Sequence, residues 1–403
     1  MDKIKIYKFK LDSGERYCIV LNKETGIPLY YPNLYLTTQF RNNGHALATI
    51  EARAVNICLF YRFLGRCSID IETYILSGRF LSGGDLDRLV TYLGRTSDTK
   101  KCLNKKSDYV SKRTLCHRLD SLTAYLSWLT EQLLQNDSLK NKNYISKIVK
   151  SIKERKPRDH NTKNCENNHD KSLSDIAVDT LVKIIDPQSP TNMFEPIVRN
   201  RNALMIMVLS ELGIRGGELL NIKIEDINFQ KKILYIRRRA DEISDPRLNQ
   251  PLVKTFSRAL SLSSDLASKL MDYIIYDRKL FLNGKTDYLF ITYKSGPFQG
   301  KPLSISSYHK IITKISHSDP LLSEFSGHKL RHTWNYNFSR LMDSQKVSER
   351  EQEQMREKLM GWKQGSGTAS TYNRRFIDEE TDKASIRLQE ILSRRGGGNI
   401  NDK

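Results

Sequence analysis

The chain has 403 residues, and 66 lysines and arginines against 46 acidic residues give it a formal net charge of +20. A hydrophobic fraction of 38% supplies enough apolar surface for folded cores, so a wholly disordered polycation is excluded. The longest apolar run, Ala203 to Leu209, is far shorter than the ~20 residues that span a bilayer, and a basic soluble protein usually has a polyanionic partner.

A β-hairpin is the first element that the pattern predicts. Residues 3–10 alternate lysine with isoleucine or an aromatic residue, which is the period of a strand. Arg16–Leu21 can pair with them across the turn residues Asp12-Ser13-Gly14. We therefore expect residues 1–44 to form a hairpin-like segment of its own.

Helices are expected over residues 45–160. One helix is predicted at Ala48–Leu64, ended by Gly65. The clearest covers residues 111–135, where leucines step by 4, 3, 4, 3 and 4 residues and so form one stripe. A stripe of this length is more typical of a bundle core than of a coiled coil.

A basic stretch closes this helical region. Residues 138–158 contain many lysines and arginines and one acid, Glu154, which indicates a basic helix end. The polar residues 161–171 then predict a linker. His160, Cys165 and His169 in and beside it lack a fourth ligand and standard zinc spacing, so no metal site is expected. The basic residues expected to contact a phosphate backbone are Lys112, Arg113, Lys150, Lys153, Arg155 and Lys156.

Residues 172–403 are predicted to form a second domain, mainly helical with a small β-sheet, so the fold class is α+β. An almost entirely apolar helix, Val198–Leu212, is expected at its centre and to end at Gly213. The other predicted elements are a helix at Leu173–Ile185, strands at Lys232–Arg237, Gln250–Thr255 and Tyr288–Tyr293, and helices at Ser306–Ile315, Lys329–Met342 and Val347–Met360.

Two motifs of this domain can carry chemistry. Arg215 follows the apolar helix and is flanked by glycines, and Glu218 can accept a hydrogen bond from its guanidinium. His328 and Arg331 lie three residues apart at a predicted helix start, so they share one helix face. Taken singly, the first motif is equally compatible with an ordinary structural Arg–Glu pair, and an isolated second motif favours a solvated basic helix start.

A third motif makes the set recognisable. Gly361-Trp362 is followed ten residues later by Tyr372, and the order Arg215, His328-x-x-Arg331, Trp362, Tyr372 resembles the signature of the tyrosine recombinase (phage integrase) family. The resemblance spans roughly residues 172–385. Trp362 stands where the family usually has a histidine, a substitution known within the family.

The resemblance implies cleavage and rejoining of duplex DNA. Tyr372 would be the nucleophile and form a 3′-phosphotyrosine, while Arg215 and Arg331 stabilise charge on the scissile phosphate. His328 would accept the tyrosine proton, and Trp362 would donate its indole N–H to the phosphate.

The family also uses a lysine that protonates the departing 5′ oxygen. Lys254 is our choice, because Arg258 to Leu262 resembles the strand that follows this lysine in the family. Lys231, Lys232 and the arginines 237–239 compete with it. The chemistry requires no metal and no cofactor, and the sequence has no P-loop.

By the same resemblance, the helical domain at 45–160 binds the core DNA site and forms a clamp around DNA with the catalytic domain. Four protomers would synapse two DNA sites, with accessory DNA-bending proteins as further candidate partners and no membrane. The segment Glu379–Arg394 would pack on a neighbouring protomer or on its own, and residues 1–44 would bind a second DNA site or cap the fold. Such a protein is expected in the bacterial cytoplasm, with the nucleoid.

Two other functions fit the same residues. A type IB topoisomerase or a telomere resolvase uses the same chemistry, and the sequence separates them poorly from an integrase of a mobile element. A non-catalytic DNA-binding accessory protein is the other alternative, but the complete set of motif residues argues against it.

Overall fold

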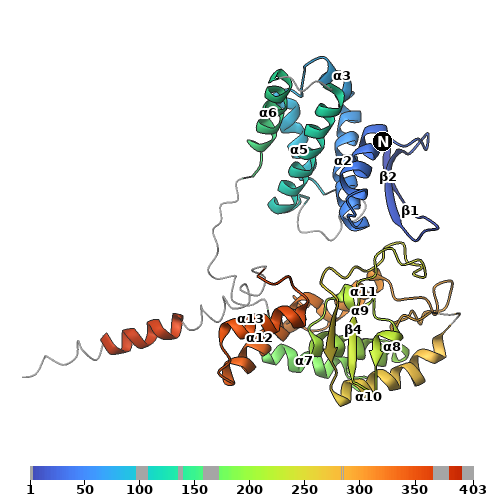
Figure 1. The fold of residues 1–403 in the computed structure, drawn as a ribbon, viewed down its shortest axis with the longest axis vertical. Coiled ribbons are helices and arrows are strands. Elements are labelled where there is room, and N and C mark those ends of the chain that lie inside the picture. Colours follow the sequence, from blue (N-terminus) through green and yellow to red (C-terminus); the bar gives the residue numbers. More distant parts are fainter. Residues whose placement is uncertain are drawn as a thin grey trace, which may run out of the picture. The chain divides into compact units, whose positions relative to one another are not determined.

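In the computed structural model, two compact units divide the chain, Met1–Thr162 and Lys163–Lys403, and each is considered separately (Figure 1). The structure describes residues 3–96, 108–134, 139–157, 172–282, 284, 286–365 and 381–392. Within these residues no helix is long and apolar enough to cross a membrane.

The N-terminal unit begins with the predicted hairpin. Strands β1 (Ile4–Lys10) and β2 (Arg16–Asn22) pair antiparallel, with Tyr7 opposite Ile19. The helical elements that follow are α1 (Tyr30–Leu36), η1 (Thr37–Arg41), α2 (Leu47–Cys67), α3 (Ile71–Leu76), α4 (Gly83–Gly94), α5 (Lys112–Leu134) and α6 (Leu139–Lys153).

Hairpin and helices share one hydrophobic core. Cys18 and Val20 of β2 are fully buried in the same cluster as the leucine stripe of α5. Leu119 and Leu126 are likewise fully buried, so the stripe forms the core of a helical bundle, as predicted. Burial of β2 on the helices supplies the apolar contact that an isolated two-stranded hairpin lacks.

The prediction that Gly65 ends the helix expected at Ala48–Leu64 was wrong. Helix α2 continues through Gly65 to Cys67 and is followed by Ser68, which has a left-handed backbone with φ of 54°. A glycine costs a helix about 1 kcal/mol relative to alanine, and the many apolar residues that α2 buries outweigh that cost.

The C-terminal unit surrounds the apolar helix α8 (Pro196–Leu212), which ends at Gly213 as expected (Figure 1). Its other elements are α7 (Asp175–Ile185), α9 (Gly216–Leu219), η4 (Ile224–Asp226), β3 (Ile227–Asn228), β4 (Ile233–Ile236), β5 (Arg258–Ser261), α10 (Ser264–Asp272), η5 (Tyr273–Asp277), η6 (Arg278–Phe281), α11 (Ile305–Ser316), η7 (Pro320–Leu322), α12 (Gly327–Ser344) and α13 (Glu349–Met360). A further helix covers residues 381–392.

Its sheet is smaller than predicted. The described strands pair antiparallel in the order β3-β4-β5, with Leu234 opposite Leu260. Residues 250–255 form no strand, because the segment lies against α9 instead of pairing with β4. Residues 288–293 contribute only isolated bridges, at Tyr288 and Ile291. Both strand predictions were therefore wrong, although their apolar side chains are buried.

Candidate functional site

Arg215 lies where the central helix α8 gives way to α9. Gly213 ends α8 with a φ of 60°, and a Cβ at this position would lie 2.7 Å from the indole ring of Trp334. A side chain is therefore excluded at Gly213 by both its backbone conformation and the close approach of α12. The Arg215 Nη1 is buried 3.7 Å from a carboxylate oxygen of Glu218 and has no hydrogen-bond partner in the described part of the chain. The side chain as a whole is 30% exposed, so the remainder of the guanidinium is available to an anion.

Glu218 does not hold the Arg215 guanidinium as the sequence suggested. The two side chains are 3.7 Å apart, beyond hydrogen-bond distance, and Glu218 accepts a hydrogen bond from the Arg215 backbone N–H instead, at 3.0 Å. The carboxylate is bound by Arg258, whose Nη2 donates at 2.8 Å, and by the hydroxyl of Thr255 at 2.5 Å. Sequence analysis missed this pair because Arg258 lies 40 residues further along the chain.

Electrostatics keep the buried Glu218 ionised. Burial by itself raises the pKa of its carboxyl, but the hydrogen bond and charge of Arg258, with the bonds from Thr255 and the Arg215 N–H, outweigh burial and lower the pKa below its ordinary value. The Glu218–Arg258 pair is thus a charged anchor directly beneath Arg215.

Arg331 connects the three motifs. It is fully buried, and its Nη1 donates to the carbonyl of Gly213 at 2.8 Å while its Nη2 donates to that of Met360 at 3.3 Å. These two carbonyls lie two residues before Arg215 and two residues before Trp362. The guanidinium also lies over the Trp362 ring, 5.2 Å from its centroid. One side chain of α12 therefore fixes the chain next to both other motifs.

Trp362 directly follows the end of α13. Gly361 ends this helix with a φ of 65°, and its carbonyl accepts the N–H of Phe256 at 2.9 Å. A Cβ at Gly361 would lie 2.8 Å from the carbonyl oxygen of Phe256, so only glycine allows this contact. Trp362 itself is buried, and the Arg258 Nε donates to the carbonyl of Leu359 at 2.6 Å.

His328 occupies the first turn of α12. It is exposed, whereas Arg331 on the same helix is fully buried. Its ring packs edge-on against His332, with centroids 4.5 Å apart. Sequence analysis did not single out His332, although it lies four residues after His328 and so one helical turn away.

Lys254 lies on a segment that contacts α9 on both sides of it. The carbonyl of Leu252 would be 2.7 Å from a Cβ at Gly217, and Thr255 bonds Glu218. Lys254 between them is exposed. Lys232 differs, because its Nζ donates to the hydroxyl of Ser264 at 2.7 Å. These contacts place the segment that carries Lys254 against α9, the helix that directly follows Arg215.

Alanine substitutions separate these two lysines. If Lys254 is the general acid that the resemblance implies, Lys254→Ala should slow DNA cleavage by on the order of 100-fold, while Lys232→Ala should cleave at the rate of the unmodified chain. The measurement is single-turnover cleavage of a nicked duplex from the ends of the element that encodes this chain. Normal cleavage by Lys254→Ala together with slow cleavage by Lys232→Ala would reverse the assignment.

Tyr372 lies outside the described residues, as do His160, Cys165 and His169 in and beside the linker.

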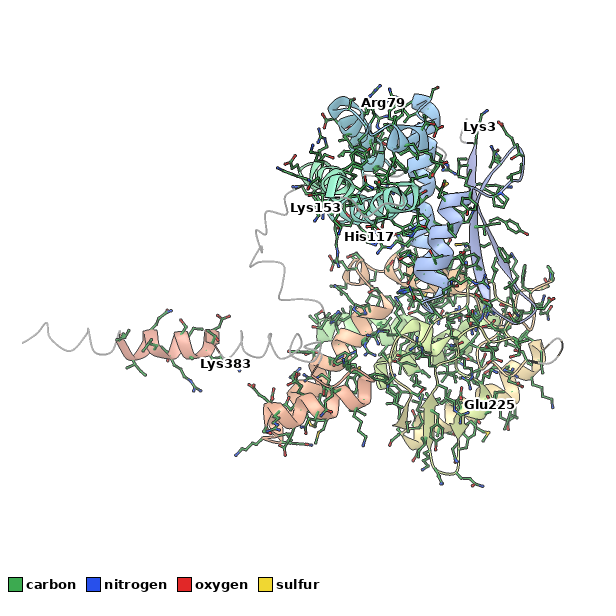
Figure 2. The ribbon with its side chains drawn as sticks, turned by 45° about the horizontal axis from the view of Figure 1, so that its top comes forward. Lys3, Arg79, His117, Lys153, Glu225 and Lys383 are labelled. Atoms are coloured by element: carbon green, nitrogen blue, oxygen red, sulfur yellow. The ribbon has the colours of Figure 1, made fainter. Side chains whose placement is uncertain are left out.

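In the N-terminal unit, Lys112, Arg113 and Lys153 are exposed and form no ion pair with described residues. Lys153 is marked on α6 in Figure 2. The other basic candidates have intramolecular partners: Lys150 with Glu154 at 3.9 Å, Arg155 with Asp87 at 2.7 Å and Lys156 with Asp120 at 2.6 Å.

Comparison with known proteins identifies the arrangement. Residues 177–377 match the model of the phage integrase family, and this range contains Arg215, His328, Arg331, Trp362 and Tyr372. The chain belongs to the phage integrase family. Within the matched range, Arg331 contacts the backbone beside Arg215 and beside Trp362.

Curated relatives come from bacteria. Transposase A from transposon Tn554 of Staphylococcus aureus is 34% identical over 134 residues, which are 33% of this chain and 34% of the transposase. Tyrosine recombinase XerS of Streptococcus gordonii is 22% identical over 57% of this chain and 61% of XerS. The chain thus spans about a third of the length of the Tn554 transposase in that match.

Solved structures share the fold. The XerH site-specific recombinase bound to its difH substrate matches with a TM-score of 0.51 and 17% identity, over 88% of this chain and 85% of XerH. The Tn1549 transposon integrase in complex with transposon right end DNA also matches with a TM-score of 0.51, at 14% identity, over 90% of this chain and all of that integrase chain. Both matches support the α+β recombinase fold that the sequence predicted.

Proposed function

We propose that this chain is a site-specific DNA recombinase, of the integrase type encoded by mobile elements. The observation that carries the proposal is the convergence of the motifs on Arg331, whose guanidinium bonds the backbone beside Arg215 and Trp362. Membership of the phage integrase family and relatives named as a transposase and a recombinase support it.

The reaction is transfer of a DNA phosphodiester to Tyr372. The accessible guanidinium of Arg215 binds the scissile phosphate and stabilises charge on its non-bridging oxygens as the pentavalent transition state forms. The fully buried Arg331 adds a second positive charge beneath the phosphate. His328, exposed beside them, accepts the proton of the tyrosine hydroxyl.

The lysine and tryptophan complete the chemistry. Lys254 protonates the 5′ oxygen that leaves as the 3′-phosphotyrosine forms. Trp362 has only an N–H to offer, so it donates a hydrogen bond to the phosphate and moves no proton. The phosphotyrosine conserves the energy of the broken bond, so rejoining needs neither a nucleotide nor a metal cofactor.

Duplex DNA is the proposed partner of both units. The N-terminal helical unit binds the core site through exposed basic residues, among which Lys112, Arg113 and Lys153 are unpaired with described residues, and forms a clamp with the catalytic unit. Many phosphate contacts make such binding fall steeply with salt. A protein that acts on genomic DNA in this way resides with the bacterial nucleoid.

We propose that four protomers assemble on two synapsed sites, with accessory DNA-bending proteins as further partners. The helix at 381–392 supports assembly, because its apolar residues Ile386, Leu388, Ile391 and Leu392 are each at least half exposed. Removal of residues 379–403 is expected to abolish synapsis of two DNA sites in sedimentation while single-site binding persists. Intact synapsis by the truncated chain would favour a helix that serves only its own protomer.

The test of the function is covalent trapping followed by strand exchange. The chain should form a covalent complex on a nicked duplex from its own element ends and recombine two such sites. Rapid relaxation of a supercoiled plasmid that lacks those sites would favour a type IB topoisomerase, and sealed hairpin products would favour a telomere resolvase. Duplex binding without any cleavage would favour a non-catalytic accessory protein.

A further inference from the structure

Tyr308 of α11 lies between the backbones of two catalytic motifs. A Cβ at Gly216, the residue after Arg215, would be 2.7 Å from the Tyr308 ring and hydroxyl. A Cβ at Gly327, the residue before His328, would be only 2.0 Å from the same hydroxyl oxygen. The two glycines thus let one phenol approach both motifs at once.

The hydroxyl of Tyr308 can donate a hydrogen bond to a ligand. The side chain is 6% exposed, and its hydroxyl forms no hydrogen bond with any described residue. The hydroxyl oxygen is not among the fully buried polar atoms that lack a partner, so its tip reaches solvent and can donate to a bound acceptor. Burial raises the pKa of Tyr308 to about 12, so the group stays protonated and able to donate at neutral pH.

Other donors of the site belong to the residues next to these two glycines. The Nη1 of Arg215, one residue from Gly216, also has no hydrogen-bond partner in the described residues. Helix α12 starts at Gly327, and Ser326 caps only the N–H of Lys329, so the preceding N–H groups of its first turn can attract an anion. A neutral O–H donor between these groups matches a phosphate oxygen.

We propose that Tyr308 is a further catalytic residue, whose hydroxyl donates a hydrogen bond to a non-bridging oxygen of the scissile phosphate. This inference rests on the proposed recombinase function. The phenol ring is a spacer between the backbones at Arg215 and His328, and the hydroxyl contacts the substrate. As charge grows on the phosphate oxygens, the bond strengthens and lowers the barrier to cleavage.

Tyr308→Phe tests the hydroxyl alone. It keeps the ring in place, so we expect an unchanged melting temperature and unchanged duplex affinity, with cleavage slowed by about 10- to 100-fold. Single-turnover covalent trapping on a nicked duplex measures this rate. Tyr276→Phe, which removes the hydroxyl of an exposed tyrosine on η5, is the matched control and should cleave normally. Tyr308→Ala also removes the spacer and should melt at a lower temperature.

Substitution of the phosphate identifies the contact. In a methylphosphonate duplex, one non-bridging oxygen is replaced by a methyl group that accepts no hydrogen bond. In one of the two stereoisomers, the methyl group replaces the oxygen that Tyr308 would contact. With that stereoisomer the hydroxyl has no acceptor, so the unmodified chain and Tyr308→Phe should cleave at equal rates.

Three outcomes overturn the inference. Normal cleavage of the phosphate duplex by Tyr308→Phe would leave Tyr308 as a spacer only. A defect that persists with both stereoisomers would place the action of the hydroxyl elsewhere. Failure of the unmodified chain to cleave any element-end duplex would overturn both this inference and the recombinase function.

Discussion

Tyr372→Phe is expected to abolish covalent protein–DNA complexes on a nicked duplex while leaving duplex binding nearly intact. The substitution removes only the oxygen that would attack phosphorus, so the cations that bind the DNA backbone remain. A nicked substrate releases the short strand after cleavage, and the covalent complex therefore accumulates unless the nucleophile is missing. Denaturing gels measure the complex, and fluorescence anisotropy measures binding.

Two phenylalanine variants give this result its meaning. Tyr276→Phe should trap DNA normally, because Tyr276 is exposed and belongs to none of the motifs. Tyr308→Phe retains the nucleophile, so it should trap DNA slowly but to completion. Undiminished trapping by Tyr372→Phe would contradict the assignment of the nucleophile. Loss of duplex binding in the same variant would indicate that Tyr372 acts through the fold.

Much of the fold could be predicted because its strongest signals are local. The leucine stripe requires one face of a helix to be buried, and Leu119, Leu122 and Leu126 are indeed core residues. Gly213 could be predicted as a helix end because an apolar run stops there. The end of the helix at Gly65 was predicted wrongly, since the cost of one glycine is smaller than the gain from burying Phe63 and Leu64 before it and packing Cys67 after it.

The apolar segments at 250–255 and 288–293 show a second limit. Both bury most of their apolar side chains, as a strand would, but their partners are ones that no periodicity reveals. The backbone of the first lies against Gly217 and its Thr255 side chain bonds Glu218, and the second forms a bridge with Lys223. Alternation reports which side chains are buried and not what the backbone bonds.

Within the site, the sequence indicated the residue types but not their contacts. Arg215 and Arg331 were predicted as equivalent phosphate ligands, yet one is partly exposed and the other is fully buried among carbonyls. Arg258, Thr255 and Tyr308 belong to no motif, and they approach Arg215 only through tertiary packing. Long-range contacts of this kind leave no spacing in the sequence to recognise.

Glu218→Ala is expected to lower both stability and activity strongly. The substitution leaves Arg258, whose side chain is 5% exposed, as a buried cation without its carboxylate, which costs about 3–5 kcal/mol. It also releases the backbone N–H of Arg215 and the hydroxyl of Thr255, so both sides of the site lose their shared anchor. Where the variant remains folded, we expect cleavage to fall by on the order of 100-fold, as small displacements of catalytic groups do.

Controls and pH separate the ionic contribution from simple loss of packing. Asp265→Ala removes an exposed partner of Lys269 and should change stability by no more than about 0.5 kcal/mol. Glu218→Gln keeps a hydrogen-bond acceptor, so its loss of stability should lie between those of Asp265→Ala and Glu218→Ala. Because the folded pKa of Glu218 lies below its ordinary 4.5, its ionic stabilisation is complete above that pH and is lost as the pH falls through the folded pKa. The stability difference between the unmodified chain and Glu218→Ala, from urea melts, should therefore be constant near neutral pH and shrink in acid. A difference independent of pH down to acid unfolding would mean that packing, and not the Glu218–Arg258 charge pair, anchors Arg215.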